Sequence, residues 1–395
     1  IRFKGFDDDW EERKLGELFE EYSEKNHLEL PALTIIQGGG TVKREESDRN
    51  LMYDKSNLSG YKMIRENDFI VHLRSFEGGL EKASTDGIIS PAYHTFHGEN
   101  VDSRFYYPYF RSHEFIKRKL IAHVYGIRDG RSIDIDGMKT IEIPYILYEE
   151  QCKIGDYLES LDHLISLHQR KWDEVKQLKK FMLQKMFPKS GKLIPEIRFA
   201  GFTGDWEQRK LGEVCARVQG NDGRMELPTL TISSGNGWMK QEDRFSGNIA
   251  GKEQKNYTLL RKGELSYNHG NSKLAKYGAV FSLRTYEEAL VPRVYHSFKV
   301  INGNADFVEY YFATKLPGRE LGKLISSGAR MDGLLNIGYN EFMGIPLMFP
   351  TMEEQTRIAI YFRHLDHLIT LHQRKCNQLK EVKHFMLQNM FPQRG

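Results

Sequence analysis

Apolar residues recur every three or four positions through two long stretches of the chain, residues 149–188 and 353–392. The positions seven apart are apolar or histidine: Ile154, Leu161, His168, Val175 and Met182 in the first stretch, and Ile358, Leu365, His372, Leu379 and Met386 in the second. After Gly155, neither stretch contains Gly or Pro before its final Pro. This heptad pattern predicts two helices of about 40 residues, each roughly 60 Å long.

Two further apolar lines widen the stripe on each predicted helix. One line lies three residues on from the first, at Tyr157, Leu164 and Leu178, and at Tyr361, Leu368 and Val382. The other comprises Leu158, Ile165 and Trp172, and Phe362, Ile369 and Cys376. Because each stripe is wider than a two-position seam, the two helices are expected to pack on each other along a broad face.

The two stretches are copies of one sequence. EEQCKIGDYLESLDHLISLHQRK stands opposite EEQTRIAIYFRHLDHLITLHQRK, and a shorter motif, IRFKGFDDDWEERKLGEL at residues 1–18, recurs as IRFAGFTGDWEQRKLGEV at residues 197–214. Such a duplication indicates two units, each made of an entry motif, a variable body and a long helix. We expect a pseudo-twofold molecule in which the helices form an antiparallel coiled coil with the two bodies at opposite ends.

The variable bodies mix short β-like runs with loops and helices, which predicts an α+β fold with two mixed domains. Expected strands are Leu33–Ile36, Asp68–Leu73, Gly87–Ile89 and Thr140–Ile143, then Thr229–Ser233, Glu264–Asn268, Ala279–Leu283 and Arg293–Phe298. Expected helices are Tyr106–Ile121 and Phe307–Ile325. We divide the chain into a first domain (1–148), a first long helix (149–188), a linker with a second domain (189–352) and a second long helix (353–392).

Composition and charge exclude some classes of protein but do not identify a binding partner. The 395 residues carry a formal net charge of +3, which permits an anionic partner but does not require one. Three scattered cysteines form no CxxC pair, so neither a disulfide framework nor a zinc site is expected. No signal-peptide pattern or membrane-length apolar run occurs, so we expect a protein of the reducing cytoplasm.

No convincing catalytic signature occurs in the sequence. Residues 247–252 resemble a phosphate-binding loop but are one residue short, and Glu253 stands where Ser or Thr would ligate magnesium. His113 lacks a second histidine at HExxH spacing. Asp7–Asp9 fit a solvated turn better than a metal site, and the repeated helix histidines fit a packed seam better than metal ligands. The chain is therefore expected to be a non-catalytic protein that binds no cofactor or metal itself.

Two diverged bodies joined by stiff helices suit a ligand with two sites at a fixed distance, such as DNA. Reading base edges needs polar side chains on loops where glycine lets the backbone approach a groove. The candidates in the first body are Lys43, Arg44, Arg74, Ser75, Arg128 and Arg131. The candidates in the second body are Lys240, Asn268, His269, Asn271, Lys273 and Arg330. For any one of these residues, an ordinary solvated loop position is the favoured interpretation, but several of the loops recur at matching places in both bodies, which strengthens the group.

The sequence resembles the specificity subunit of type I restriction-modification systems. The resemblance covers nearly the whole chain and rests on the duplicated LDHLISLHQRK and LDHLITLHQRK helices, the GFDDDWEERKLGEL and GFTGDWEQRKLGEV motifs, and the IP…EEQ approach to each helix. It implies two target-recognition domains that each read one half of a split DNA sequence. It also implies that the long helices set the gap between the halves.

The same resemblance implies partners for this chain. Two modification subunits would carry S-adenosylmethionine and methylate adenine N6, and two restriction subunits would use ATP and magnesium for translocation and cleavage. The alternative that the residues leave open is a coiled-coil scaffold whose bodies bind proteins. Sequence-specific binding to duplex DNA that weakens steeply with salt separates these two possibilities.

Overall fold

The computed structural model describes residues 2–47, 55–72, 79–126, 132–189, 191–245, 251–270, 272–325 and 335–391. The chain divides into two compact units: unit 1 comprises Ile1–Gln169 and Gln373–Gly395, and unit 2 comprises Arg170–His372. The two long helices, α4 (Tyr148–Lys185) and α10 (Met352–Met390), each contribute to both units. The predicted pair of long helices is therefore confirmed.

Unit 1 is built around a four-stranded antiparallel sheet of order β2-β9-β6-β7, accompanied by strand pairs β1-β12, β3-β4, β5-β8 and β10-β11. Its strands are β1 (Glu11–Lys14), β2 (Glu20–Tyr22), β3 (Leu33–Ile36), β4 (Gly40–Lys43), β5 (Lys62–Ile64), β6 (Phe69–His72), β7 (Glu81–Lys82), β8 (Gly87–Ile89), β9 (Tyr93–His97), β10 (Val124–Tyr125), β11 (Ser132–Ile133) and β12 (Glu142–Tyr145). Its shorter α-helices are α1 (Leu15–Leu18), α2 (Ser103–Phe110) and α3 (Ile135–Lys139).

Unit 2 repeats this plan with a four-stranded sheet of order β14-β21-β18-β19 and the pairs β13-β22, β15-β16 and β17-β20. Its strands are β13 (Glu207–Lys210), β14 (Cys215–Arg217), β15 (Leu230–Ser233), β16 (Gly237–Lys240), β17 (Thr258–Arg261), β18 (Leu265–Asn268), β19 (Ala279–Ser282), β20 (Glu288–Val291), β21 (His296–Val300) and β22 (Pro346–Phe349). Its shorter helices are α5 (Leu211–Val214), α6 (Gln241–Phe245), α7 (Ala305–Ala313), α8 (Gly318–Lys323) and α9 (Tyr339–Met343). The duplicated α+β architecture expected from the sequence is present.

Both helices that were expected in the bodies are shorter than predicted. The stretch 106–121 splits into α2, which contains Pro108, a π-helical turn (Glu114–Lys119) and a 3-10 turn (Leu120–His123). The stretch 307–325 splits into α7 and α8, because Lys315 adopts a left-handed φ of 64° and Pro317 begins a new helix. Local backbone chemistry therefore ends helices that the apolar pattern would have continued.

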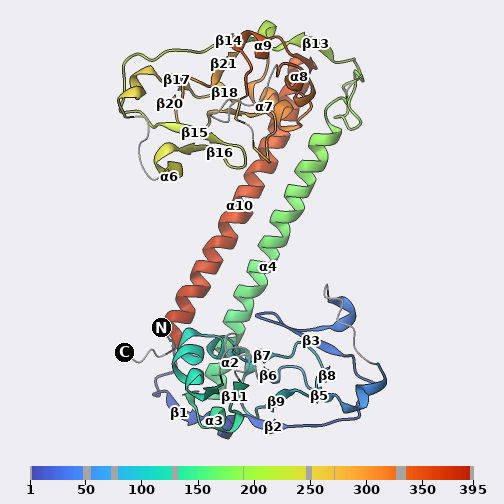
Figure 1. Cartoon of the computed structure of the whole chain (residues 1–395), viewed down its shortest axis with the longest axis vertical. Coiled ribbons are helices and arrows are strands. Elements are labelled where there is room, and N and C mark those ends of the chain that lie inside the picture. Colours follow the sequence, from blue (N-terminus) through green and yellow to red (C-terminus); the bar gives the residue numbers. More distant parts are fainter. Residues whose placement is uncertain are drawn as a thin grey trace. The chain divides into compact units, whose positions relative to one another are not determined.

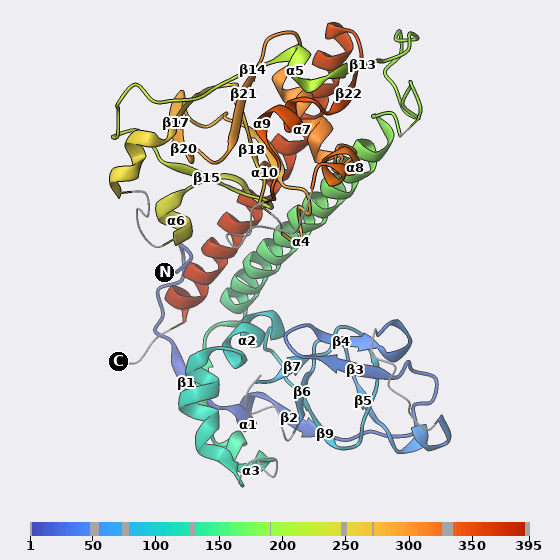
Figure 2. The same cartoon turned by 45° about the horizontal axis from the view of Figure 1, so that its top comes forward.

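Within each unit, α4 and α10 lie side by side and run antiparallel (Figures 1 and 2). In unit 1, Asp162 contacts Lys383 at 2.5 Å, and further along α4 Gln169 contacts Cys376, which is earlier in α10. In unit 2, Lys179 contacts Asp366 at 2.5 Å. These two ion pairs are the repeat-equivalents of each other, so the two halves of the coiled coil are built alike.

The predicted apolar lines of the two long helices are buried to different extents. Leu158 and Phe362 are almost fully buried and Ile165 and Ile369 are half-buried, whereas Leu164, Leu178 and Val382 are 40%, 43% and 41% exposed. The line that starts at Leu158 and Phe362 therefore faces the partner helix, together with the heptad line of Ile154 and Ile358. The second predicted line is only partly buried: Tyr157, Tyr361 and Leu368 are half-buried, whereas the other members are exposed.

The repeated motifs fasten each body to its long helix. Arg2 forms a two-bonded pair with Glu150 at 2.8 and 2.7 Å, and Arg198 does the same with Glu354 at 2.7 Å for both bonds. Both glutamates are fully buried. A buried carboxylate needs such a partner, which explains why the arginine and the glutamate recur together.

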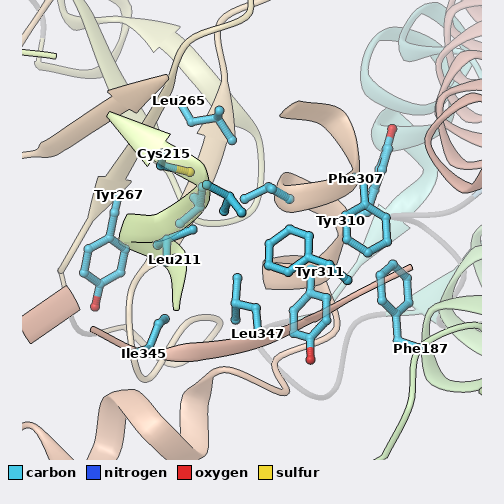
Figure 3. Close-up of a cluster of buried hydrophobic side chains, with 14 of the residues drawn as sticks. Phe187, Leu211, Cys215, Leu265, Tyr267, Phe307, Tyr310, Tyr311, Ile345 and Leu347 are labelled. Atoms are coloured by element: carbon cyan, nitrogen blue, oxygen red, sulfur yellow. The ribbon is translucent and has the colours of Figure 1, made fainter. Parts of the chain in front are cut away.

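A separate aromatic core fills each unit. In unit 2, Phe187 from the end of α4 packs against Tyr311 with ring centroids 5.5 Å apart, and the cluster extends to Leu211 and Leu347 (Figure 3). In unit 1, Phe391 from the end of α10 takes the corresponding place, 5.6 Å from Tyr109. Each body therefore rests on the start of one long helix and the end of the other.

Candidate nucleic-acid interface

A glycine-containing hairpin recurs on the same side of each body. Strands β3 and β4 form it in unit 1 and strands β15 and β16 form it in unit 2, and each hairpin lies on the side of its body toward which the long helices run (Figures 1 and 2). Gly40 and Gly237 close the two turns with the same left-handed φ of 72°. A Cβ on Gly40 would lie 2.7 Å from the carbonyl oxygen of Lys82, so this turn requires glycine.

The buried carboxylate of Glu81 stabilises the turn of the hairpin in unit 1. Glu81, whose side chain is 4% exposed, accepts hydrogen bonds from the backbone N–H of Gly38 at 2.7 Å and of Gly40 at 3.2 Å. Tyr107 donates to it at 2.8 Å and Arg111 forms an ion pair with it. Burial raises the pKa of Tyr107, and the adjacent Glu81 carboxylate raises it further, so the phenol stays a donor.

Unit 2 supports its hairpin with different chemistry. Asn268 donates through Nδ2 to the carbonyl oxygen of Ile232 at 3.2 Å and accepts from the backbone N–H of Gly270 at 3.0 Å. Ser272 and Ser234 are hydrogen-bonded at 3.2 Å. The two hairpins thus share their backbone and differ in the side chains that position them.

Lys43 and Lys240 occupy the same register position in the two hairpins. Lys43 pairs with Leu33 across β3-β4, and Lys240 pairs with Leu230 across β15-β16. Lys43 is half-exposed and lies 3.6 Å from Glu46, whereas Lys240 is 45% exposed and lies 3.0 Å from Glu242, which raises its pKa. Both side chains are therefore exposed beside a carboxylate.

The other predicted residues within the described part of the chain are less alike. Arg44 donates to the carbonyl oxygen of Leu33 at 3.2 Å and lies over the Tyr61 ring at 5.4 Å. His269 is 6% exposed, and its ring lies 4.9 Å from that of His296. Asn268 supports the hairpin, as described above, and Lys273 is exposed. The remaining candidates, Arg74, Ser75, Arg128, Arg131, Asn271 and Arg330, lie outside the described residues.

Two arginine side chains that the sequence analysis did not select also lie next to the hairpins. Arg111 stands behind the Gly38 turn through its pair with Glu81. Arg244 in α6 donates to the carbonyl oxygen of Ile232 at 2.8 Å. Arg111 is distant from its hairpin in sequence, so only tertiary contact reveals its proximity, whereas Arg244 lies in the helix that directly follows β16.

The described residues offer little support for metal or membrane chemistry. They contain no group of three or more His, Cys, Asp or Glu side chains that could hold a metal ion. His168 and His372, which lie on the heptad lines, are half-buried. No helix among these residues is long and apolar enough to cross a membrane.

A family model and solved structures of similar proteins point to the same family. The family model described as the type I restriction modification DNA specificity domain matches residues 7–177 and 203–381. A solved type I restriction-modification S subunit from M. genitalium is 16% identical, with a TM-score of 0.59 over 100% of this chain and 98% of that chain, which shows a shared fold. An HsdS subunit from Thermoanaerobacter tengcongensis is 17% identical, with a TM-score of 0.44 over 97% of this chain and 96% of that chain. No protein with a curated description matches the chain.

Proposed function

Because the chain belongs to the family of type I restriction-modification DNA specificity domains, we propose that it reads an asymmetric, split DNA target. Each recognition domain, 1–148 or 189–352, reads one half-site, and the helices 149–188 and 353–392 set the gap. The observation that carries this proposal is the duplicated hairpin, in which Lys43 and Lys240 share a register position while the supporting side chains differ. Two domains with the same backbone and different side chains suit two half-sites of different sequence.

The chemistry of methylation and cleavage belongs to partner subunits in this proposal. The chain itself holds no cofactor, and S-adenosylmethionine, ATP and magnesium are bound by the modification and restriction subunits. A methyltransferase must extrude its target adenine, so the pocket for that base lies in the modification subunit. The chain acts in the cytoplasm, where cellular DNA and these partners meet.

The long helices provide an equivalent docking face in each unit. Phe181 and Leu178 are 48% and 43% exposed in unit 2, and their repeat-equivalents Phe385 and Val382 are 54% and 41% exposed in unit 1. Exposed aromatic and aliphatic side chains on an ordered helix mark protein contact sites. Two equivalent faces fit two copies of one partner, which we assign to the modification subunit.

The test is sequencing of methylated adenines in DNA from cells that carry the neighbouring modification subunit, with and without this chain. A split motif that appears only with the chain supports the proposal and gives both half-sites. If both proteins are soluble and associated and no chain-dependent motif appears, the chain is a protein scaffold instead. Restriction subunits are tested separately, by ATP-dependent cleavage of unmethylated DNA that carries the motif.

A further inference from the structure

Unit 1 contains a cavity of about 790 Å³ beside the foot of the long helices. Its lining residues come from α2 and the turn after it, from α4 and α10, and from Gly38 and Lys82. Its lining includes Pro108, Tyr109, Leu158, Asp162, Lys383 and Phe391. Pockets of this size hold a small molecule or a short segment of a partner.

The equivalent place in unit 2 is filled by Tyr310 from α7. This side chain is 2% exposed, and its hydroxyl donates to Oδ2 of Asp366 at 2.8 Å. Its ring lies 5.1 Å from the Phe362 ring, and the ammonium of Lys179 lies 5.3 Å from its centroid. The Arg284 guanidinium lies over the same ring at 5.8 Å, so Tyr310 makes one hydrogen bond, one aromatic contact and two cation–π contacts.

Equivalent contacts at both ends of α2 and α7 show that Pro108 of α2 occupies the position of Tyr310 in α7. The backbone N–H groups of Asp102 and Asn304, at the helix starts, donate to the side-chain oxygens of Gln151 and Gln355 at 2.9 and 3.0 Å. Near the helix ends, Tyr109 packs on Phe391 at 5.6 Å, as Tyr311 packs on Phe187 at 5.5 Å. The residue before each of these tyrosines is Pro108 in unit 1 and Tyr310 in unit 2.

The polar part of the wall that receives Tyr310 in unit 2 is retained in unit 1. Leu158, Asp162 and Lys383 are the repeat-equivalents of Phe362, Asp366 and Lys179. Lys383 contacts Oδ1 of Asp162 at 2.5 Å, as Lys179 contacts Oδ1 of Asp366 at 2.5 Å. Unit 1 therefore keeps the carboxylate and the ammonium, has the aliphatic side chain of Leu158 in place of the Phe362 ring, and lacks the phenol.

We propose that this cavity is a docking site for a tyrosine side chain presented by a segment of a partner protein. The tyrosine hydroxyl donates to Asp162, its ring lies beneath Lys383, and its edge packs on Leu158. The cavity is larger than one phenol ring, so residues that flank the tyrosine enter with it. The Tyr109 side chain lines the cavity, and its hydroxyl is buried without a hydrogen-bond partner in the described part of the chain. This inference goes beyond DNA recognition and does not rest on it.

The test measures binding of N-acetyl-L-tyrosinamide to the full chain by ligand-detected NMR titration. We expect one site with a dissociation constant of roughly millimolar, because one ring buries little area. N-acetyl-L-phenylalaninamide should bind about 2–10-fold more weakly, because it cannot donate to Asp162. Asp162→Asn, at a side chain that is 57% exposed and tolerant of change, should weaken tyrosinamide by a similar factor.

Two variants make the test specific to this cavity. Pro108→Tyr should fill the cavity from within and abolish binding, whereas Tyr310→Ala should open the equivalent cavity of unit 2 and give two sites. Unchanged binding to folded Pro108→Tyr, or to Asp162→Asn, overturns the site. Binding of p-cresol as tight as that of the amide overturns the assignment to a protein segment, because the flanking atoms would then contribute nothing.

Discussion

Among the candidate interface residues, Lys43 and Lys240 occupy the most similar positions in the two bodies. Each ends the second strand of its hairpin, and each lies near a glutamate that is also exposed. A lysine ammonium with three rotating donors suits a phosphate better than a base edge, for which the planar guanidinium of arginine is the better match. We therefore propose that these lysines contact phosphates of the DNA backbone and not base edges.

Lys43→Ala and Lys240→Ala should each weaken binding by a similar factor on all DNA sequences. Each should also reduce the slope of log K against log salt by about 1, because one phosphate contact is lost. Fluorescence anisotropy with target and non-target duplexes at several salt concentrations measures both effects. Lys323→Ala is the matched control, since Lys323 is also exposed and paired with a nearby glutamate, at 2.7 Å, but lies on α8. A loss confined to one base position would make either lysine a base contact.

Arg284 carries a second residue-scale prediction, on stability and pH. It contacts Asp306 and Glu309 at 2.8 Å each, and Glu309 is 6% exposed. Burial raises the pKa of Glu309, and Arg284 counteracts that rise. Arg284→Ala leaves a buried carboxylate without its cation and should cost about 3 kcal/mol of unfolding free energy at neutral pH.

The sign of the pH dependence follows from protonation of Glu309. A folded-state pKa above the unfolded value means that the folded protein binds the proton more tightly, so stability is gained below that pKa and lost as pH rises. The Arg284→Ala deficit should therefore be smaller at pH 5 than at pH 8 in urea unfolding. Arg261→Ala, at a side chain 64% exposed, should change stability by less than about 0.5 kcal/mol. An equal deficit at both pH values would contradict the role of Glu309.

At the scale of elements, the seam between the long helices separates apolar residues that look alike in the sequence. Leu161 is 6% exposed and Leu164 is 40% exposed, although both stand on predicted apolar lines of α4. Leu161→Ala should cost about 2–5 kcal/mol and Leu164→Ala less than about 0.5 kcal/mol. Thermal unfolding followed by circular dichroism compares the two. Similar losses for both would mean that Leu164 is covered in the free chain.

Elements were predictable from sequence where local pattern decides them. β3 and β8 have the expected bounds, because apolar runs there are bordered by Pro31, Gly38 and Gly87. The hairpin support was not predictable, because Glu81 joins residues 38, 40, 107 and 111, which only the fold brings together. His269 shows the same limit: it lies in a polar sequence, yet packing against His296 buries it.

At the scale of the whole molecule, each unit holds α4 against α10 by an equivalent ion pair. Asp162 pairs with Lys383 in unit 1, and Lys179 pairs with Asp366 in unit 2. A heptad inserted only in α4, between residues 169 and 170, would lengthen one helix by about 10 Å. Both ion pairs could not then persist along a continuous seam, so the single insertion should lower stability.

A heptad inserted in both helices, between 169 and 170 and between 372 and 373, should preserve both ion pairs and lengthen the spacer. Ten ångströms correspond to about 3 base pairs at ~3.4 Å each, so the methylated motif should keep both half-sites and widen its gap by about that number. Adenine-methylation sequencing in cells with the modification subunit reads the gap directly, and circular dichroism checks that the helices are retained. The single insertion disturbs the seam and the double insertion does not. Comparing the two variants therefore shows whether helix length sets the spacing between the half-sites or whether the helices only hold the bodies together. An unchanged gap in the folded double variant would show that the helices hold the bodies together without setting the distance that they read.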